Sequence, residues 1–109
     1  MPMEALLGEI RIIASETVPE HWLPCDGRIL QIRSNPALYS LLGNMYGGDG
    51  TSTFALPDLR ARVPIHRSYE RPQGERAAAA PAQGATAEQQ FLAFNFCICA
   101  DYGVFPPRQ

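Results

Sequence analysis

The chain has 109 residues, of which 46% are hydrophobic and 18% charged, and its formal net charge is −2. This length suits one domain with one modest core, and the composition is that of a globular protein. The small net charge excludes a global field that would draw the molecule to nucleic acid or to anionic lipid. All nine basic residues are arginine, which excludes catalysis by a lysine base or a lysine Schiff base.

No stretch of the sequence is apolar for the roughly 20 residues that a membrane helix needs, so we expect no membrane insertion. The start of the chain, residues 1–4, lacks the basic segment and apolar core of a Sec signal. We therefore expect the protein either to stay in the bacterial cytoplasm or to leave it by a route that needs no signal, such as packaging into a particle. Ten prolines and nine glycines favour short strands, turns and loops over a helical bundle.

The first third of the chain predicts short strands joined by a turn. Residues 6–13 (LLGEIRII) alternate with the period of a strand. Asp26 and Gly27 then predict a tight turn between residues 23–25 and a strand-like stretch at 28–32.

One short helix is predicted in the middle of the chain. Residues 34–36 (SNP) place an N-cap residue ahead of a proline, and residues 37–42 carry an apolar stripe. Gly43 is a natural stop for this helix. Residues 46–53 (YGGDGTST) then predict a loop, whose glycines permit positive φ angles and whose Asp49 turns back onto its own backbone.

The second half alternates extended segments with one abrupt change in composition. Residues 54–59 and 62–66 each contain a proline, which predicts edge strands or extended segments. Residues 67–90 contain no Leu, Ile, Val, Phe or Met, so they bury too little to offset their ordering entropy and predict a mobile loop. Residues 91–99 (FLAFNFCIC) are apolar on both faces, which predicts a strand buried on both sides with Asn95 hydrogen-bonded in it.

Three motifs follow one another along the chain: WLPCDG at residues 22–27, LYSLLGNMYGGDGTSTFALPDLRARVPIH at 38–66, and FLAFNFCICADYGVF at 91–105. In this order they resemble the phage Tail Collar domain family, of the microcystin-dependent-protein type. The resemblance implies a single domain over 1–109 with a small α+β, mostly β fold, one short helix and a long loop at 67–90 in place of the family's variable insert. The motif positions that it marks as structural are Trp22, Cys25, Asp26, Gly27, Tyr46, Gly47, Gly48, Asp49, Gly50, Pro57, Asp58, Arg60 and His66.

The resemblance also implies a function and a departure from the family pattern. It implies a phage-tail structural and interaction module that self-associates, as a homotrimer, and takes part in receptor binding at a tail or fibre tip. The location that it implies is a phage tail, a virion or a phage-derived particle. Many relatives carry a metal-binding His-x-His segment after the RVPIH motif, whereas residues 67–90 contain no histidine. We therefore expect no metal and no cofactor, and the departure puts receptor binding in doubt more than the fold.

Two cysteines, Cys97 and Cys99, lie on one face of the predicted strand and could form a zinc site with His21 and His66. Structural zinc sites usually take their cysteines from short chelating loops, so the apolar context favours buried thiols. The chain has three cysteines, an odd number, which argues against a disulfide framework.

No set of residues in the sequence amounts to catalytic machinery, and we expect no enzyme. Cys25 with His21 would need a third orienting group and a lowered thiol pKa. Asp26 and Asp58 fit turn acceptors better than an acid–base pair.

A stand-alone carbohydrate-binding module is the alternative function, because arginines and exposed aromatic rings bind sugars. The residues that would face such a glycan are Arg62, Arg67 and Tyr69. For Trp22 and Tyr46 we favour a place in the small core. Besides itself and a glycan, the expected partners are other tail or particle proteins.

Overall fold

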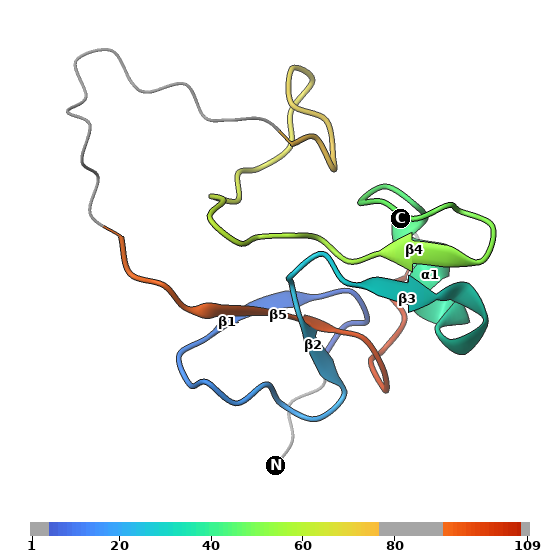
Figure 1. Ribbon diagram of the computed structural model, residues 1–109, viewed down its shortest axis with the longest axis horizontal. Helices are drawn as coiled ribbons and strands as arrows, with labels where there is room; N and C mark the ends of the chain where they lie inside the picture. The colour runs from blue at the N-terminus through green and yellow to red at the C-terminus, as the bar shows by residue number, and fades with distance from the viewer. Residues whose placement is uncertain (1–4, 77–90, 108–109) are drawn as a thin grey trace.

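The computed structural model describes residues 5–76 and 91–107. Over these residues the chain forms short strands and a single seven-residue helix, which confirms the α+β, mostly β fold (Figure 1). The elements follow in the order β1 (Ile10–Ile13), β2 (Trp22–Pro24), β3 (Ile29–Gln31), a 3-10 turn η1 (Ile32–Ser34), α1 (Pro36–Leu42), β4 (Thr53–Ala55) and β5 (Asn95–Cys99).

A three-stranded antiparallel sheet has the strand order β1-β5-β2. The last strand therefore lies between the first two, and Ile98 in its middle pairs with Ile10 on one side and Leu23 on the other. This central place explains why Cys97, Ile98 and Cys99 are fully buried. Strands that lie far apart in the sequence are thus joined by backbone pairing (Figure 1).

A two-stranded antiparallel sheet, β3-β4, lies beside the first and carries α1 next to it (Figure 1). Phe54 on β4 pairs with Leu30 on β3 and is fully buried. Its ring meets the edge of the Tyr39 ring of α1, with the centroids 5.4 Å apart. Burying one such side chain stabilises the fold by roughly 2–3 kcal/mol.

The core joins both sheets and the helix. Its buried cluster consists of Leu7, Cys25, Leu38, Phe54, Leu56 and Ile98. The helix contributes through Leu38 and begins with Pro36 at its first turn, as predicted. Gly43 ends it with a φ of 58°. Asn35 occupies the N-cap position, but its amide donates to the Gln31 carbonyl oxygen at 3.0 Å instead of capping the helix.

The strand predicted at residues 6–13 begins only at Ile10. Gly8 has a φ of 84°, and the Glu9 N–H donates to the Leu6 carbonyl oxygen, so the chain turns before the strand starts. Leu6 instead forms an isolated bridge with Val104.

The strand predicted at residues 91–99 is also shorter and begins at Asn95. Its pairing with β1 runs from Ile98 to Asn95, opposite Ile10 to Ile13. Phe91 and Leu92 lie beyond this pairing and are 90% and 77% exposed, so the prediction that they are buried was wrong. Asn95 does find a hydrogen bond, from its amide to the Ser15 carbonyl oxygen at 2.7 Å.

Residues 62–66 form no strand and are exposed, with Val63 and Ile65 at 81% and 69%. Residues 67–76 contain only turns, in keeping with a loop. They still touch the rest of the fold, because the Gln73 amide donates to the Tyr46 hydroxyl at 3.3 Å. The remainder of the predicted loop, 77–90, lies outside the described residues. No described helix has the length and apolar character to cross a membrane.

We expect trypsin to cut at Arg67 or Arg76 well before other sites, because these arginines lie in an exposed segment without strand pairing. The two fragments should stay together, since β5 pairs with β1 and β2 of the other fragment. Limited proteolysis followed by size exclusion and mass spectrometry measures both. First cuts at Arg28 or Arg33, which are also exposed, would contradict this expectation.

Candidate functional site

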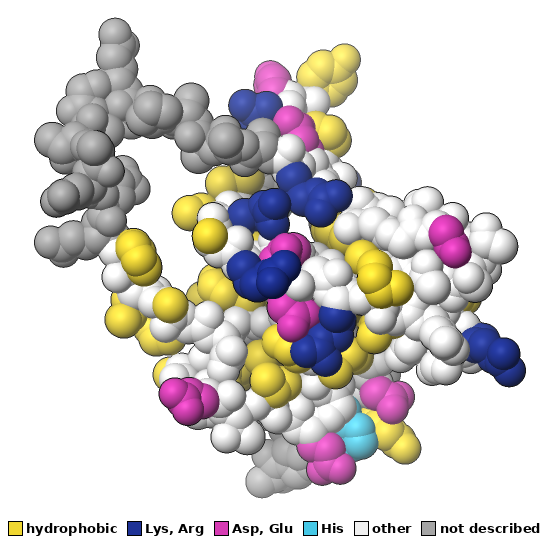
Figure 2. All heavy atoms as spheres, viewed as in Figure 1, with side chains coloured by type: hydrophobic (Ala, Val, Ile, Leu, Met, Phe, Trp, Pro, Cys, Tyr) yellow, Lys and Arg dark blue, Asp and Glu magenta, His cyan; other side chains and the backbone are white. Residues whose placement is uncertain are grey.

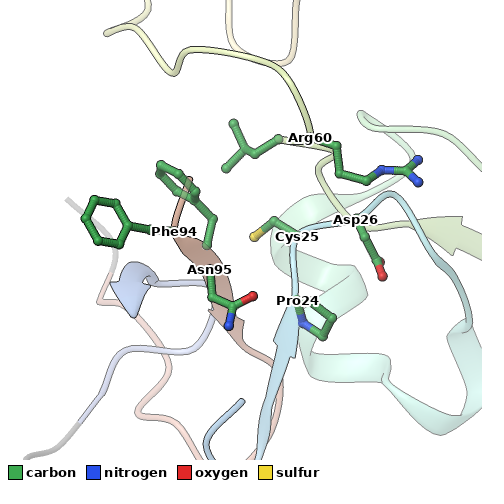
Figure 3. A pocket seen from close by; sticks show the side chains of 8 residues that line it. Pro24, Cys25, Asp26, Arg60, Phe94 and Asn95 are labelled. Carbon is green, nitrogen blue, oxygen red and sulfur yellow. The ribbon is translucent and has the colours of Figure 1, made fainter. Parts of the chain in front are cut away.

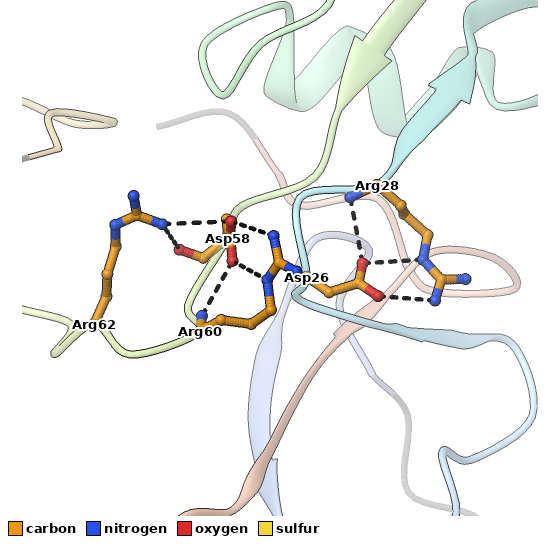
Figure 4. Close-up of polar contacts among 5 residues, drawn as sticks. All are labelled: Asp26, Arg28, Asp58, Arg60 and Arg62. Carbon is orange, nitrogen blue, oxygen red and sulfur yellow. Dashed lines mark hydrogen bonds and ion pairs between the residues drawn. The ribbon is translucent and has the colours of Figure 1, made fainter.

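Two Asp-x-Arg turns lie side by side where the two sheets meet (Figure 4). The Asp26 carboxylate accepts the backbone N–H of Arg28 at 3.3 Å and two guanidinium N–H groups, each at 3.0 Å. Asp58 repeats the arrangement with Arg60, at 3.1 Å from the backbone N–H and 2.9 and 2.8 Å from the guanidinium. Asp26 and Asp58 are also partners in an antiparallel bridge, so a local two-fold relation links the turns.

The two turns lock to each other through the backbone. The Gly27 N–H donates to the Pro57 carbonyl oxygen at 3.2 Å, and the Leu59 N–H donates to the Cys25 carbonyl oxygen at 2.9 Å. Gly27 has a φ of 75°, and a Cβ there would lie 3.0 Å from the Asp58 Cβ. Only glycine therefore allows this approach without strain, and the WLPCDG and FALPDLR motifs meet at this point.

The charges of these turns gather near the middle of one face of the molecule, where basic and acidic side chains alternate (Figure 2). A third guanidinium, that of Arg62, lies 3.5 Å from the Asp58 carboxylate and donates to the Asp58 carbonyl oxygen at 2.9 Å. The hydrogen bonds from Arg60 hold the pKa of Asp58 well below its usual range, and those from Arg28 lower the pKa of Asp26. Both carboxylates are thus kept ionised as turn acceptors, which disfavours a general acid at neutral pH.

The Asp49 carboxylate organises the YGGDG loop. Its Oδ1 accepts the backbone N–H groups of Thr51, Ser52 and Thr53 at 2.8, 2.8 and 2.9 Å. These hydrogen bonds, that from Thr53 first, hold the pKa of Asp49 well below its usual range. In a loop that binds phosphate, backbone N–H groups of this kind would donate to the anion. Here they donate to the Asp49 carboxylate of the same loop instead.

Gly48 allows the backbone of this loop to pack directly against β4. A Cβ at Gly48 would lie 2.4 Å from the Cα of Phe54. The Ala55 N–H donates to the Gly47 carbonyl oxygen at 3.0 Å, and the Tyr39 hydroxyl donates to the Gly50 carbonyl oxygen at 3.1 Å. The loop thus fixes β4 against the helix.

The three thiols are free and buried. Burial raises the pKa of all three, and that of Cys25 to about 12, which disfavours the thiolate that a nucleophile or a zinc ligand needs. His21 packs instead on Tyr102, with the ring centroids 4.2 Å apart. Within residues 5–76 and 91–107, no three His, Cys, Asp or Glu side chains come together as a metal site.

The aromatic residues assigned to the core are only half-buried. Trp22 lies on β2 with the Arg11 guanidinium 5.3 Å from its ring centroid, and Tyr46 accepts the hydrogen bond from Gln73. Of the three residues expected to face a ligand, Arg67 and Tyr69 line one open hollow of about 430 Å³. Arg62 does not line this hollow and is held at Asp58 instead. His66 is exposed.

A smaller pocket of about 130 Å³ lies between the end of β2 and the start of β5 (Figure 3). The Cys25 side chain points toward it, whereas the charged ends of Asp26 and Arg60 point away (Figure 3). Its wall is therefore mainly apolar. The lining residues are Pro24, Cys25, Asp26, Leu59, Arg60, Phe94, Asn95 and Phe96. Sequence reasoning missed this pocket because three separate segments form it.

The interlocked turns join the two sheets into one small domain. The family model for the Phage Tail Collar Domain matches residues 8–64, more than half of the chain. The chain belongs to the phage tail collar domain family, and it is therefore a structural module of the phage-tail type. The match contains both Asp-x-Arg turns, α1 and the YGGDG loop, whereas β5 lies outside it. No curated protein sequence matches the chain.

Replacing Gly48 by alanine should destabilise the fold by more than about 3 kcal/mol, because the new Cβ meets the Phe54 backbone at a positive φ. Gly43→Ala is the matched control: its φ is also positive, but nothing lies within 4 Å of the added Cβ. It should cost only the backbone strain, about 1–3 kcal/mol. Urea unfolding measures both, and equal losses would show that the loop does not pack as described.

Stability should fall as the pH drops below about 4, the ordinary aspartate pKa. Because folding lowers the pKa of Asp49, its contribution is present above the unfolded pKa and is lost as the pH falls toward the folded pKa. Asp49→Asn should therefore lower stability at pH 7 and flatten the acid limb of the unfolding free energy. Glu16→Gln, at an exposed carboxylate in the loop before β2, is the control and should leave that limb unchanged. An unaltered limb in Asp49→Asn would refute this assignment.

Proposed function

We propose that the chain is an assembly module of a phage tail or phage-derived particle, and that it associates with itself as a homotrimer at a tail or fibre tip. The observation that carries this proposal is the apolar surface left outside the core. Phe91, Leu92, Val63 and Ile65 are all largely exposed, although the core itself is small. Phe91 and Leu92 are adjacent in the sequence, and exposed apolar surface that gathers in one place marks contact sites on soluble proteins.

Open strand edges support the same proposal. Among the described strands, β1 and β2 each border only β5, and β3 and β4 border only each other. Each therefore leaves one edge without a strand partner, and such edges invite pairing with another chain. Sheets this small also gain stability when a further layer covers them.

The chemistry of the site supports binding rather than catalysis. The two central carboxylates are neutralised by arginine, and burial raises the pKa of the only thiols. These carboxylates and thiols thus do not supply the protonated acid or the thiolate that catalysis near neutral pH would use. We infer that this member of the family acts through contacts and not through a reaction.

Recognition of a host surface is part of the proposal, and the hollow lined by Arg67 and Tyr69 is its candidate contact. A fully exposed tyrosine ring beside a guanidinium can stack on a sugar ring and bind its hydroxyls. This hollow favours a carbohydrate-binding module as the second candidate function. We also propose that the chain is of the microcystin-dependent type within this family.

Light scattering after size exclusion tests the assembly. At micromolar concentration we expect a mass about three times the 12.0 kDa of one chain. A stable monomer would contradict self-association. A glycan array separates the second candidate: binding that Tyr69→Ala abolishes, in a monomeric protein, would favour the carbohydrate module.

A further inference from the structure

The pocket between β2 and β5 has the size of one apolar side chain. Its volume of about 130 Å³ is close to that of apolar protein cavities, of about 150 Å³, that take up benzene. Leu59, Phe94 and Phe96 give it apolar walls, and the buried Cys25 thiol faces it. Such a pocket can receive a phenylalanine or leucine side chain against these apolar walls.

The same chain carries exposed side chains of the size that would fit this pocket. Phe91 and Leu92 together expose apolar surface on the order of 300 Å². The backbone of residues 91–93 makes no hydrogen bond to any other described residue. These residues thus form an apolar arm that precedes β5, and Phe91 is its most exposed member.

The arm does not fill the pocket of its own chain. Phe94, three residues after Phe91, is part of the pocket wall. In an extended chain three residues span roughly 10 Å and lead Phe91 away from that wall. The exposed fraction of Phe91 agrees with this, since a ring seated in the pocket would be buried.

We propose that Phe91 of one copy inserts into the pocket of a second copy. This inference rests on the proposed self-association and assigns its contact. Arm and pocket are different surfaces of one chain, so copies can join head to tail, and such contacts form a ring, such as a trimer, where the rotation between copies closes. An anchor seated in a pocket carries much of the binding energy of an interface.

The first test is the association of Phe91→Ser. Its dissociation constant should rise at least about 30-fold, the effect of losing one anchor residue. Thermal unfolding of the dissociated chain shows that the fold is kept, because Phe91 is outside the core. Tyr102→Ser is the matched control, because Tyr102 is 82% exposed, lies on no strand and does not line the pocket. It should leave association unchanged.

The second test places a photoreactive p-azidophenylalanine at position 91 in an equal mixture of light and heavy-nitrogen-labelled chains. Irradiation should give covalent dimers in which position 91 of one isotope form is joined to a pocket-lining residue of the other, around Cys25, Leu59 or Phe96. The same probe at Tyr102, which is also highly exposed, should give no such link. A link within a single chain would overturn the proposal and show that the arm folds back.

Different outcomes contradict the proposed self-association and the proposed Phe91 contact. If the unaltered protein is a monomer, both self-association and the arm contact are wrong. If it is an oligomer that Phe91→Ser does not weaken, and position 91 links outside the pocket, only the arm contact is wrong.

Discussion

The fold depends on the bridge between Asp26 and Asp58, where two Asp-x-Arg turns share backbone hydrogen bonds. Exposed ion pairs contribute little to stability by themselves, typically less than about 1 kcal/mol. Their effect here is geometric, because each carboxylate fixes the backbone of its own turn. Because the two turns are held together, the segment that joins β2 to β3 lies beside the segment that follows β4. Cys25 and Leu56, on either side of the bridge, are thereby placed in the core.

The second constraint is that β5, the central strand of the three-stranded sheet, comes last in the sequence. β1 and β2 pair only with β5, which follows them by more than seventy residues in the sequence. The three-stranded sheet therefore cannot form until the C-terminal part of the chain is present. Contacts that are so distant in sequence slow folding, because loop closure must precede the gain from pairing. The β3–β4 pair and α1 are local, and they are the elements that can form first.

Features set by neighbouring residues were predictable from the sequence. The helix from Pro36 to Gly43, the turn at Gly27 and the Asp49 loop each depend on a few adjacent side chains. Features set by distant partners were not. The sequence of residues 91–94 is as apolar as that of β5. These residues lack a partner strand because β1 ends at Ile13, opposite Asn95. The 130 Å³ pocket escaped prediction for the same reason, since its walls meet only after folding.

The positions at which the chain leaves and rejoins the paired structure have a practical consequence. It leaves at the Asp58 turn and rejoins at Asn95, and both points are anchored independently of what connects them. Closing a longer connection costs little, about 0.6 kcal/mol for each doubling of its length. No strand lies among the described residues between these anchors, so a change in the length of this connection leaves the described strand registers in place. The pairing of the domain is, in this respect, separate from the length of the chain that links its two parts.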